Sequence, residues 1–207
     1  MAGEPFLAHQ LRLLHARGLR RAILCVGYLG EMIERDFGDG SAFGMELRYS
    51  FDGPKLLGTG GALRQALPLL GEEFFVLYGD SYLPIDYAAV LGGVSRQRAA
   101  GIDDRLSQRW GVGHEQCALR RGGASCVTTN ARARRRCGTS TTGSASFARR
   151  SLRSGRRGRA FDLADVQREL VAKDALAGHE VFQRFYEIGS HAGLAELETL
   201  LRPGTPL

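Results

Sequence analysis

The sequence predicts an α/β domain with a mainly parallel sheet, because short apolar runs alternate with segments of helical periodicity over residues 1–100. Residues 22–26 are nearly all apolar, and a similar run over residues 74–78 ends at a Gly-Asp pair. Runs of this kind are typical of strands buried on both faces of a sheet. Ligands of such sheets gather at the carboxyl ends of the strands, so we expect a site at that edge.

The elements follow from apolar spacing and from the residues that begin or end helices. Gly18, Gly38 and Pro68 are placed to end the first three helices, and Asp162 is placed to cap the fourth. The pattern predicts helices over residues 5–18, 29–37, 61–67, 163–171 and 191–201, and strands over residues 22–26, 45–51, 74–78 and 180–188.

The basic residues are concentrated in one segment. The net charge is +6, but residues 101–160 hold 14 arginines, no lysine and three acidic residues, so the rest of the chain is net acidic. This segment has no sustained apolar period and is rich in Ser, Thr and Gly, which predicts disorder. We therefore expect one domain made of residues 1–100 and 161–207, interrupted by an Arg-rich, disordered segment over residues 101–160.

Composition and cysteine spacing exclude several classes of protein. No apolar run approaches the roughly 18 residues of a membrane span, and the N-terminus lacks the pattern of a secretory signal. We expect a cytoplasmic protein without a membrane partner. The cysteines form no CxxC pair, which favours free thiols over a zinc site; they are Cys25, Cys117, Cys126 and Cys137.

A glycine-rich segment, LGTGGA, lies where a loop enters a predicted helix. Backbone N–H groups at a helix N-terminus attract anions, and missing side chains allow a ligand to approach the backbone. Gly58, Thr59 and Gly60 are therefore candidate nucleotide-binding residues. The alternative is a glycine-rich helix start without a ligand, which the motif alone does not exclude.

Two carboxylates are candidate Mg²⁺ ligands. Asp80 follows a buried strand, where one carboxylate can hold Mg²⁺ that is bound mainly by water and phosphate oxygens. Glu187 ends another predicted strand and could share the same cation. The alternatives are an Asp in a polar turn and a surface Glu before a helix that Ser190 caps.

The segments GEPFLAHQLRLL, LLGTGGAL, VLYGDSYL and FYEIGSHAGL occur in the order and spacing of the sugar-1-phosphate nucleotidylyltransferases. The chain resembles that family over residues 3–100 and 161–201, and most of all its heptose and hexose 1-phosphate guanylyltransferase-like branch. The resemblance implies a Rossmann-like fold, Mg²⁺, and a nucleoside triphosphate and a sugar 1-phosphate as substrates. It also implies that Gly58 and Thr59 contact the base, and that Asp80 and Glu187 hold the metal.

Part of the family pattern has no counterpart in the sequence. The family opens with a strand and a GGxGTR…PK loop that grips the triphosphate, and the chain begins at residues that resemble those after it. The resemblance thus implies an N-terminally truncated, incomplete fold and impaired turnover. The family also has motifs resembling WDTSNV, YDKRA and RHIDYGLGVF where residues 101–160 stand.

These three motifs can be encoded in another reading frame of the same segment. Codons exist for residues 112–117, 128–132 and 137–147 that, read in a shifted frame, spell WDTSNV, YDKRA and RHIDYGLGVF in that order. We therefore interpret residues from near 101 to near 159 as translated out of frame. A shifted frame in GC-rich DNA is rich in Arg, Gly, Ala and Ser, which explains the basic composition.

Two other functions remain as alternatives to a nucleotidyltransferase. The Arg-rich segment could bind nucleic acid through phosphates, but only Trp110 and Phe147 could stack on bases there, so we expect no specific nucleic-acid partner. A non-catalytic remnant is the other alternative. The nucleotide base, the sugar and the oligomeric state stay open.

Overall fold

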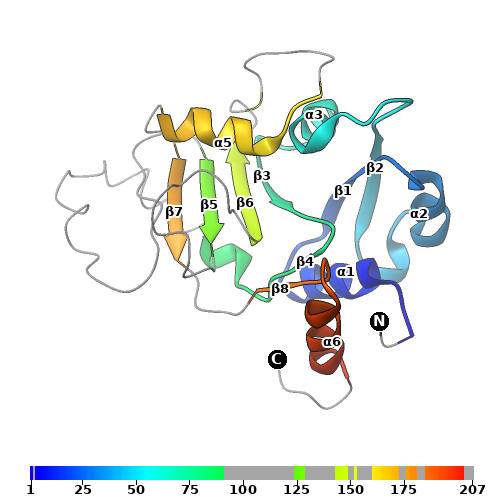
Figure 1. The fold of residues 1–207 in the computed structure, drawn as a ribbon. Coiled ribbons are helices and arrows are strands. Elements are labelled where there is room, and N and C mark those ends of the chain that lie inside the picture. The colour runs from blue at the N-terminus through cyan, green and yellow to red at the C-terminus, as the bar shows by residue number, and fades with distance from the viewer. Residues whose placement is uncertain are drawn as a thin grey trace.

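A computed structural model describes residues 1, 3–90, 124–128, 143–148, 152, 160–172, 176–180 and 185–202. Helices and strands alternate from α1 to β3 (Figure 1), as the sequence predicts. In chain order the elements are α1 (Phe6–Ala16), β1 (Arg21–Val26), α2 (Gly30–Phe37), η1 (Ser41–Phe43), β2 (Glu46–Phe51), α3 (Gly58–Ala66), β3 (Glu73–Leu77), β4 (Ser81–Tyr82), β5 (Ala124–Thr128), β6 (Gly143–Ala148), α5 (Leu163–Ala172), β7 (Leu176–Glu180), β8 (Tyr186–Glu187) and α6 (His191–Leu200).

The described strands pair in three groups. β1 and β2 are parallel, in a register that runs from Arg21 opposite Glu46 to Val26 opposite Phe51. A second group has the order β3-β6-β5-β7, in which β6 is antiparallel to both neighbours and β5 is parallel to β7. The third group is the short antiparallel pair β4–β8. The predicted parallel arrangement of the first two strands is confirmed. The second group of described strands is mixed, because it contains both antiparallel and parallel pairs.

Two segments differ from the sequence expectation. The strand predicted over residues 180–188 is wrong in extent, because β7 pairs with β5 whereas β8 pairs with β4. β5 and β6 lie inside the segment predicted to be disordered, and β6 pairs with β3 there. The backbone N–H and C=O groups of β3 need hydrogen-bond partners, and β6 supplies them. Except for Leu152 and Ala160, the rest of residues 101–160 lies outside the described part of the chain.

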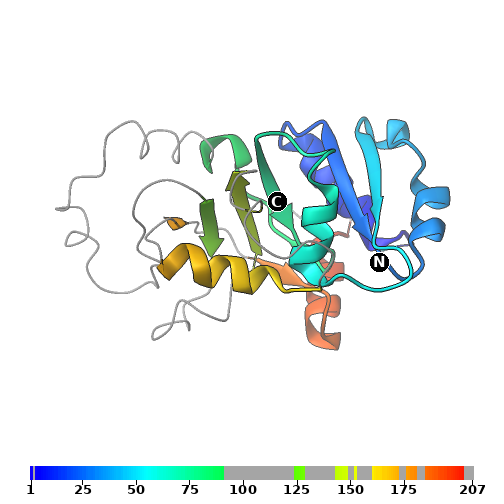
Figure 2. The ribbon, with the colours of Figure 1, turned by 90° about the horizontal axis from the view of Figure 1, so that it is seen from above.

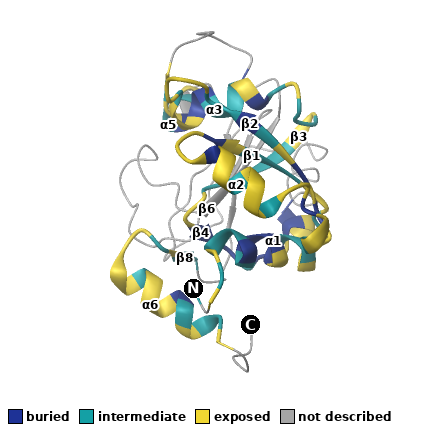
Figure 3. Ribbon diagram, turned by 90° about the vertical axis from the view of Figure 1, so that its right-hand side faces the viewer, coloured by how far each residue is buried: buried dark blue, intermediate teal, exposed yellow. Residues whose placement is uncertain are grey.

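Helix α1 joins three parts of the core. Leu11 packs with residues of β2, Leu14 packs against the cluster formed by residues 83–90, and Leu13 packs with Tyr82 and a residue of α6. Figure 3 shows buried residues along this helix. Full burial of a leucine side chain contributes about 1.5–3 kcal/mol. These contacts therefore fix α1 against both the β1–β2 pair and the β4–β8 pair.

Helices α3 and α5 pack against each other and against β3. Leu63 of α3 and Leu67, directly after that helix, contact the cluster that Leu163 and Leu170 of α5 form, and Phe74 of β3 packs against the same cluster. Figure 2 shows the two helices next to each other. Among the described residues, no helix combines the length and the apolar character needed to cross a bilayer.

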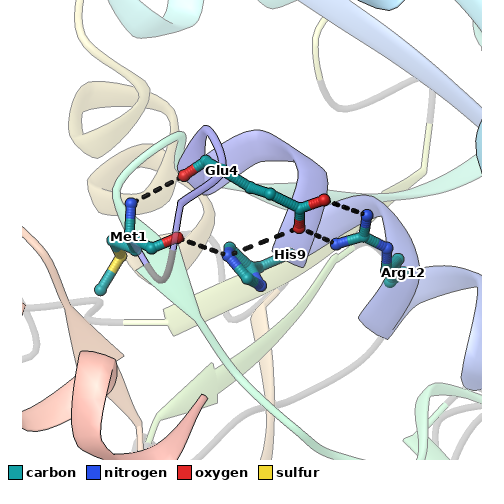
Figure 4. A network of polar contacts seen from close by, with 4 residues as sticks. All are labelled: Met1, Glu4, His9 and Arg12. Atoms are coloured by element: carbon teal, nitrogen blue, oxygen red, sulfur yellow. Dashed lines mark hydrogen bonds and ion pairs between the residues drawn. The ribbon is translucent and has the colours of Figure 1, made fainter. Parts of the chain in front are cut away.

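A polar network holds the start of α1 (Figure 4). The helix begins after Pro5 without a side-chain cap, and Glu4 instead forms an ion pair with Arg12 two turns along. The N-terminal ammonium donates to the carbonyl of Glu4 over 2.7 Å, and the Nε2 atom of His9 lies 3.1 Å from the carbonyl oxygen of Met1. The hydrogen bond from Arg12 lowers the pKa of Glu4, so this pair persists at neutral pH.

Candidate functional site

Asp80 lies in a tight turn that follows β3. The backbone N–H of Ser81 donates to the carbonyl of Tyr78 over 3.1 Å, which places Gly79 and Asp80 at the two central positions. Ser81 is buried, and its hydroxyl donates to the Oδ1 atom of Asp80 over 3.3 Å. Asp80 itself is exposed. The turn thus presents one carboxylate to solvent from a fixed backbone.

Glu187 lies directly beside this turn. Strands β4 and β8 pair so that Ser81 is opposite Glu187, and the backbone N–H of Ile188 donates to the carbonyl of Asp80 over 3.0 Å. Glu187 is also exposed. A side-chain Cβ built at Gly189 would lie 3.8 Å from the Oδ2 atom of Asp80. The structure therefore places the backbones of Asp80 and Glu187, the two residues that the sequence predicts as Mg²⁺ ligands, next to each other.

This pair of carboxylates fits a weakly held Mg²⁺ better than a closed metal cage. Among the described residues, no group of three or more His, Cys, Asp or Glu side chains could hold a metal ion. Mg²⁺ usually keeps several waters and is bound by one or two carboxylates together with substrate phosphates. Asp80 and Glu187 supply that donor set. Their role as ligands stays a prediction.

The glycine segment at the start of α3 packs against Phe161. The carbonyl of Phe161 accepts hydrogen bonds from the N–H groups of Gly60 and Gly61, over 3.0 and 3.3 Å. A Cβ at Gly60 would lie only 2.3 Å from the Phe161 ring, and Gly58 adopts a φ of +70°. Packing and backbone conformation therefore require glycine at both positions whether or not a nucleotide binds. Gly58 is exposed, whereas Gly60 is buried.

Thr59 helps to cap the N-terminus of α5. Its hydroxyl donates to the Oδ1 atom of Asp162 over 3.2 Å and accepts from the N–H of Leu163 over 2.8 Å. Asp162 in turn accepts from the N–H of Ala164, which confirms the predicted cap of α5. Sequence reasoning missed the part of Thr59 in this cap, because the residues involved are more than 100 positions apart.

The two candidate motifs do not lie at the same place in the fold. α3 lies at the upper end of the molecule in Figure 1 and β4 and β8 lie near the lower end, and Figure 3 shows the same separation. The structure brings Asp80 and Glu187 together, and it leaves the segment with Gly58, Thr59 and Gly60 apart from them. That a nucleotide uses both motifs stays a prediction.

Sequence reasoning also missed Gln10, which lies against the Asp80 turn. Its Nε2 atom donates to the carbonyls of Tyr78 and Ser81, over 3.1 and 2.7 Å, and the residue is only 4% exposed. The available signal was a polar residue among the apolar positions of the first helix, next to Leu11. A buried amide at such a position needs partners in the fold.

Comparisons with known proteins agree with the resemblance seen in the motifs. N-acetylmuramate alpha-1-phosphate uridylyltransferase of Neisseria meningitidis is 35% identical over 108 residues, which cover 52% of this chain and 45% of that protein. D-glycero-alpha-D-manno-heptose 1-phosphate guanylyltransferase of Campylobacter jejuni is 36% identical over 83 residues, which cover 40% and 37%. The chain thus spans less than half the length of either relative.

Solved structures support the fold. HddC from Yersinia pseudotuberculosis superimposes with a TM-score of 0.66 and 14% identity, over 94% of this chain and 84% of that one. The inositol-1-phosphate CTP transferase from T. maritima gives 0.59 and 18%, over 97% and 85%. The predicted α/β, Rossmann-like class is confirmed. The family model described as "Nucleotidyl transferase" matches residues 1–106. The chain therefore belongs to the nucleotidyl transferase family.

Proposed function

We propose that the chain acts in a nucleotidyltransferase reaction that joins a nucleoside triphosphate and a sugar 1-phosphate to give a nucleoside diphosphate sugar and pyrophosphate. The observation that carries this proposal is the pairing of β4 with β8, which puts Asp80 and Glu187 side by side in a chain of this family. The relatives named above differ in base and sugar, so the proposal fixes the reaction type and leaves both open.

Asp80 and Glu187 are the residues that would hold Mg²⁺. When bound, this ion neutralises charge on the phosphates of the triphosphate during attack by the sugar-phosphate oxygen. The contribution of the chain is to hold the Asp80 turn beside the end of β8 before substrates arrive. The buried Ser81 hydroxyl orients the Oδ1 atom of Asp80, and the Ile188 N–H holds the backbone of the same residue. Such fixed geometry reduces the reorganisation needed in the transition state.

Gly58, Thr59 and Gly60 are proposed to bind the nucleotide, with Gly58 and Thr59 at the base. The Thr59 hydroxyl is already engaged with α5, and the Gly60 N–H is engaged with Phe161. Gly58 is exposed, although the backbone of Phe161 fills the position that its side chain would take, so a base could approach only the solvent-facing side of Gly58. We therefore expect base contacts to centre on Gly58.

Reactions of this type depend mainly on positioning and charge stabilisation of the phosphates, so we expect Asp80→Asn and Glu187→Gln to lower turnover more than they weaken substrate binding. The cytoplasm, the compartment that the sequence predicts, stays part of this proposal.

The test combines binding and turnover. Calorimetry with GTP, CTP, UTP and ATP in the presence of Mg²⁺ should detect one preferred nucleotide, and binding should weaken in Asp80→Asn and Glu187→Gln. Pyrophosphate release with hexose and heptose 1-phosphates should fall in both variants. Unchanged release would contradict a role of the two carboxylates in the reaction. No nucleotide binding, with cooperative unfolding retained, would overturn the proposed function in favour of a non-catalytic remnant.

A further inference from the structure

Gln10 is a buried polar residue that contacts the Asp80 turn from another element. It lies in α1, 4% exposed, and Leu11 and Leu13 beside it are buried in apolar clusters. Its amide nitrogen donates two hydrogen bonds to one short stretch of chain, to the carbonyls of Tyr78 at 3.1 Å and of Ser81 at 2.7 Å. The amide therefore bridges the two residues on either side of Gly79 and Asp80.

The turn is held from two sides. From one side, the Gln10 amide binds the carbonyls before and after the Gly79-Asp80 pair. From the other, the N–H of Ile188 binds the carbonyl of Asp80 itself over 3.0 Å. Asp80 is exposed, so no packing of its own side chain fixes it. Its position therefore depends on these backbone contacts together with the hydrogen bonds of Ser81 to the carbonyl of Tyr78 and to the Asp80 carboxylate.

Gln10 connects this turn to the rigid part of the fold. Helix α1 is anchored by Leu11 against β2 and by Leu13 against Tyr82. A buried amide whose two N–H groups are both used is costly to replace, because the partner carbonyls lose a donor in a place that water does not reach easily. The bridge can thus transmit the rigidity of α1 to the turn.

We propose that Gln10 is a positioning residue for the metal site, and that it sets the affinity of Asp80 and Glu187 for a divalent cation. The inference rests on the proposed function, because it takes Asp80 as a metal ligand. Groups that orient metal ligands without touching the metal typically change the metal affinity about 10- to 100-fold when they are removed. Gln10 contacts the backbone of the ligand turn and not the carboxylate, so we expect the lower part of that range.

The experiment is a Mn²⁺ titration, followed by the electron paramagnetic resonance signal of free Mn²⁺, without nucleotide or sugar. The variants are Gln10→Met, which keeps the shape of the side chain and removes both donors, and Gln10→Asn, which keeps the amide and shortens its reach. We expect Mn²⁺ affinity to fall about 10-fold in Gln10→Met. Asp80→Asn serves as the control that lacks the Asp80 carboxylate.

A matched control separates positioning from general stability. Leu47 is 6% exposed in the β2 part of the core, in the same cluster as Leu11 and away from the turn. Leu47→Ala should lower the melting temperature and leave Mn²⁺ affinity unchanged. If Leu47→Ala weakens Mn²⁺ binding as much as Gln10→Met does, the effect is one of stability and the inference is wrong.

The remaining outcomes are also decisive. If wild type binds Mn²⁺ in an Asp80-dependent way and both Gln10 variants bind equally well, Gln10 has only a structural role. If wild type shows no Asp80-dependent binding, the metal site of the proposed function fails and the inference fails with it. If Gln10→Met does not fold, the Mn²⁺ affinity of Gln10→Asn tests the inference, because that variant retains a polar group in the buried position. An affinity equal to that of wild type would then overturn the inference.

Discussion

The backbone N–H of Ile188 donates a hydrogen bond to the carbonyl oxygen of Asp80, with 3.0 Å between the two atoms. This bond joins the end of β8 to the turn after β3, two parts of the chain more than 100 residues apart in sequence. It extends the β4–β8 pairing, in which Ser81 is opposite Glu187. These contacts hold the backbones of Asp80 and Glu187 next to each other.

The first prediction concerns this pair. Asp80→Asn and Glu187→Gln should each weaken Mn²⁺ binding, because each change replaces a charged oxygen ligand with a neutral amide. If both carboxylates bind one ion, the effects of the two changes should not add. Residues that share one partner typically show a coupling energy of about 0.5–3 kcal/mol. Mn²⁺ titrations of wild type, the two single variants and the double variant measure this coupling.

A control for this comparison of single and double variants uses an exposed carboxylate elsewhere in the fold. Glu46→Gln, on β2, removes an acid that forms an ion pair with Arg48 and should leave Mn²⁺ affinity unchanged. Fully additive effects of Asp80→Asn and Glu187→Gln would contradict a shared ion.

A second prediction concerns the packing of Phe161 on α3. Gly60→Ala should destabilise the fold, because the new Cβ would lie 2.3 Å from the Phe161 ring and 3.1 Å from the backbone of Asp162. Overpacking of this kind costs roughly 1–3 kcal/mol. The better helix propensity of alanine offsets about 1 kcal/mol of that cost. Urea unfolding should therefore show a lower midpoint with an unchanged slope.

The matched control for this substitution is Gly71→Ala. A Cβ at Gly71 would meet the carbonyl of Glu73 at 3.5 Å, an ordinary contact, so its midpoint in urea should stay close to that of wild type. A Gly60→Ala protein as stable as wild type would show that the Phe161 ring can move aside without cost.

Local sequence patterns predicted the parts of the fold that depend on local physics. Apolar runs and helical spacing identified β1, β2, β3 and the helices, because each pattern reflects burial of one face of one element. The helix predicted to begin at Gly61 begins at Gly58, since the carbonyl of Phe161 supplies partners for its first turn. That partner lies 100 residues away, so no local pattern contains it.

The candidate site was predictable only in part, for the same reason. A carboxylate directly after a buried strand identified Asp80, and a second one at a strand end identified Glu187. Strands β4 and β8 have two residues each, too short for a period to be detected, so their pairing could not be predicted from pattern alone. Gln10 was missed because an isolated polar residue in a helix looks the same in sequence whether it faces solvent or a buried turn.

A third prediction concerns the thiol of Cys25. Cys25 is exposed at the surface, yet desolvation by its surroundings, with a smaller contribution from the carboxylate of Asp52, raises the pKa of its thiol to about 11. The thiolate is the reactive form, so alkylation by iodoacetamide should be slow at pH 8 and should accelerate as the pH approaches 11. Because the protonated thiol is favoured in the fold, its contribution to stability should be lost as the pH rises through that value. Mass spectrometry of the Cys25 peptide measures the rate.

The comparison variant for the thiol is Asp52→Asn. Removing the negative charge should lower the pKa of Cys25 and speed its alkylation at a given pH, although desolvation keeps the pKa above the ordinary range. Rapid alkylation of wild type at pH 8 in the folded protein would contradict the raised pKa.

The last prediction concerns the coding DNA of residues 101–160, which we propose is read out of frame. Codons for residues 112–117, 128–132 and 137–147 should spell WDTSNV, YDKRA and RHIDYGLGVF when read in a shifted frame. Each visible residue restricts the possible nucleotides, so three family motifs in the correct order would not arise by chance in an authentic basic segment. Sequencing this stretch decides the question, and codons that cannot encode the motifs would instead make the 14 arginines a genuine property of the protein.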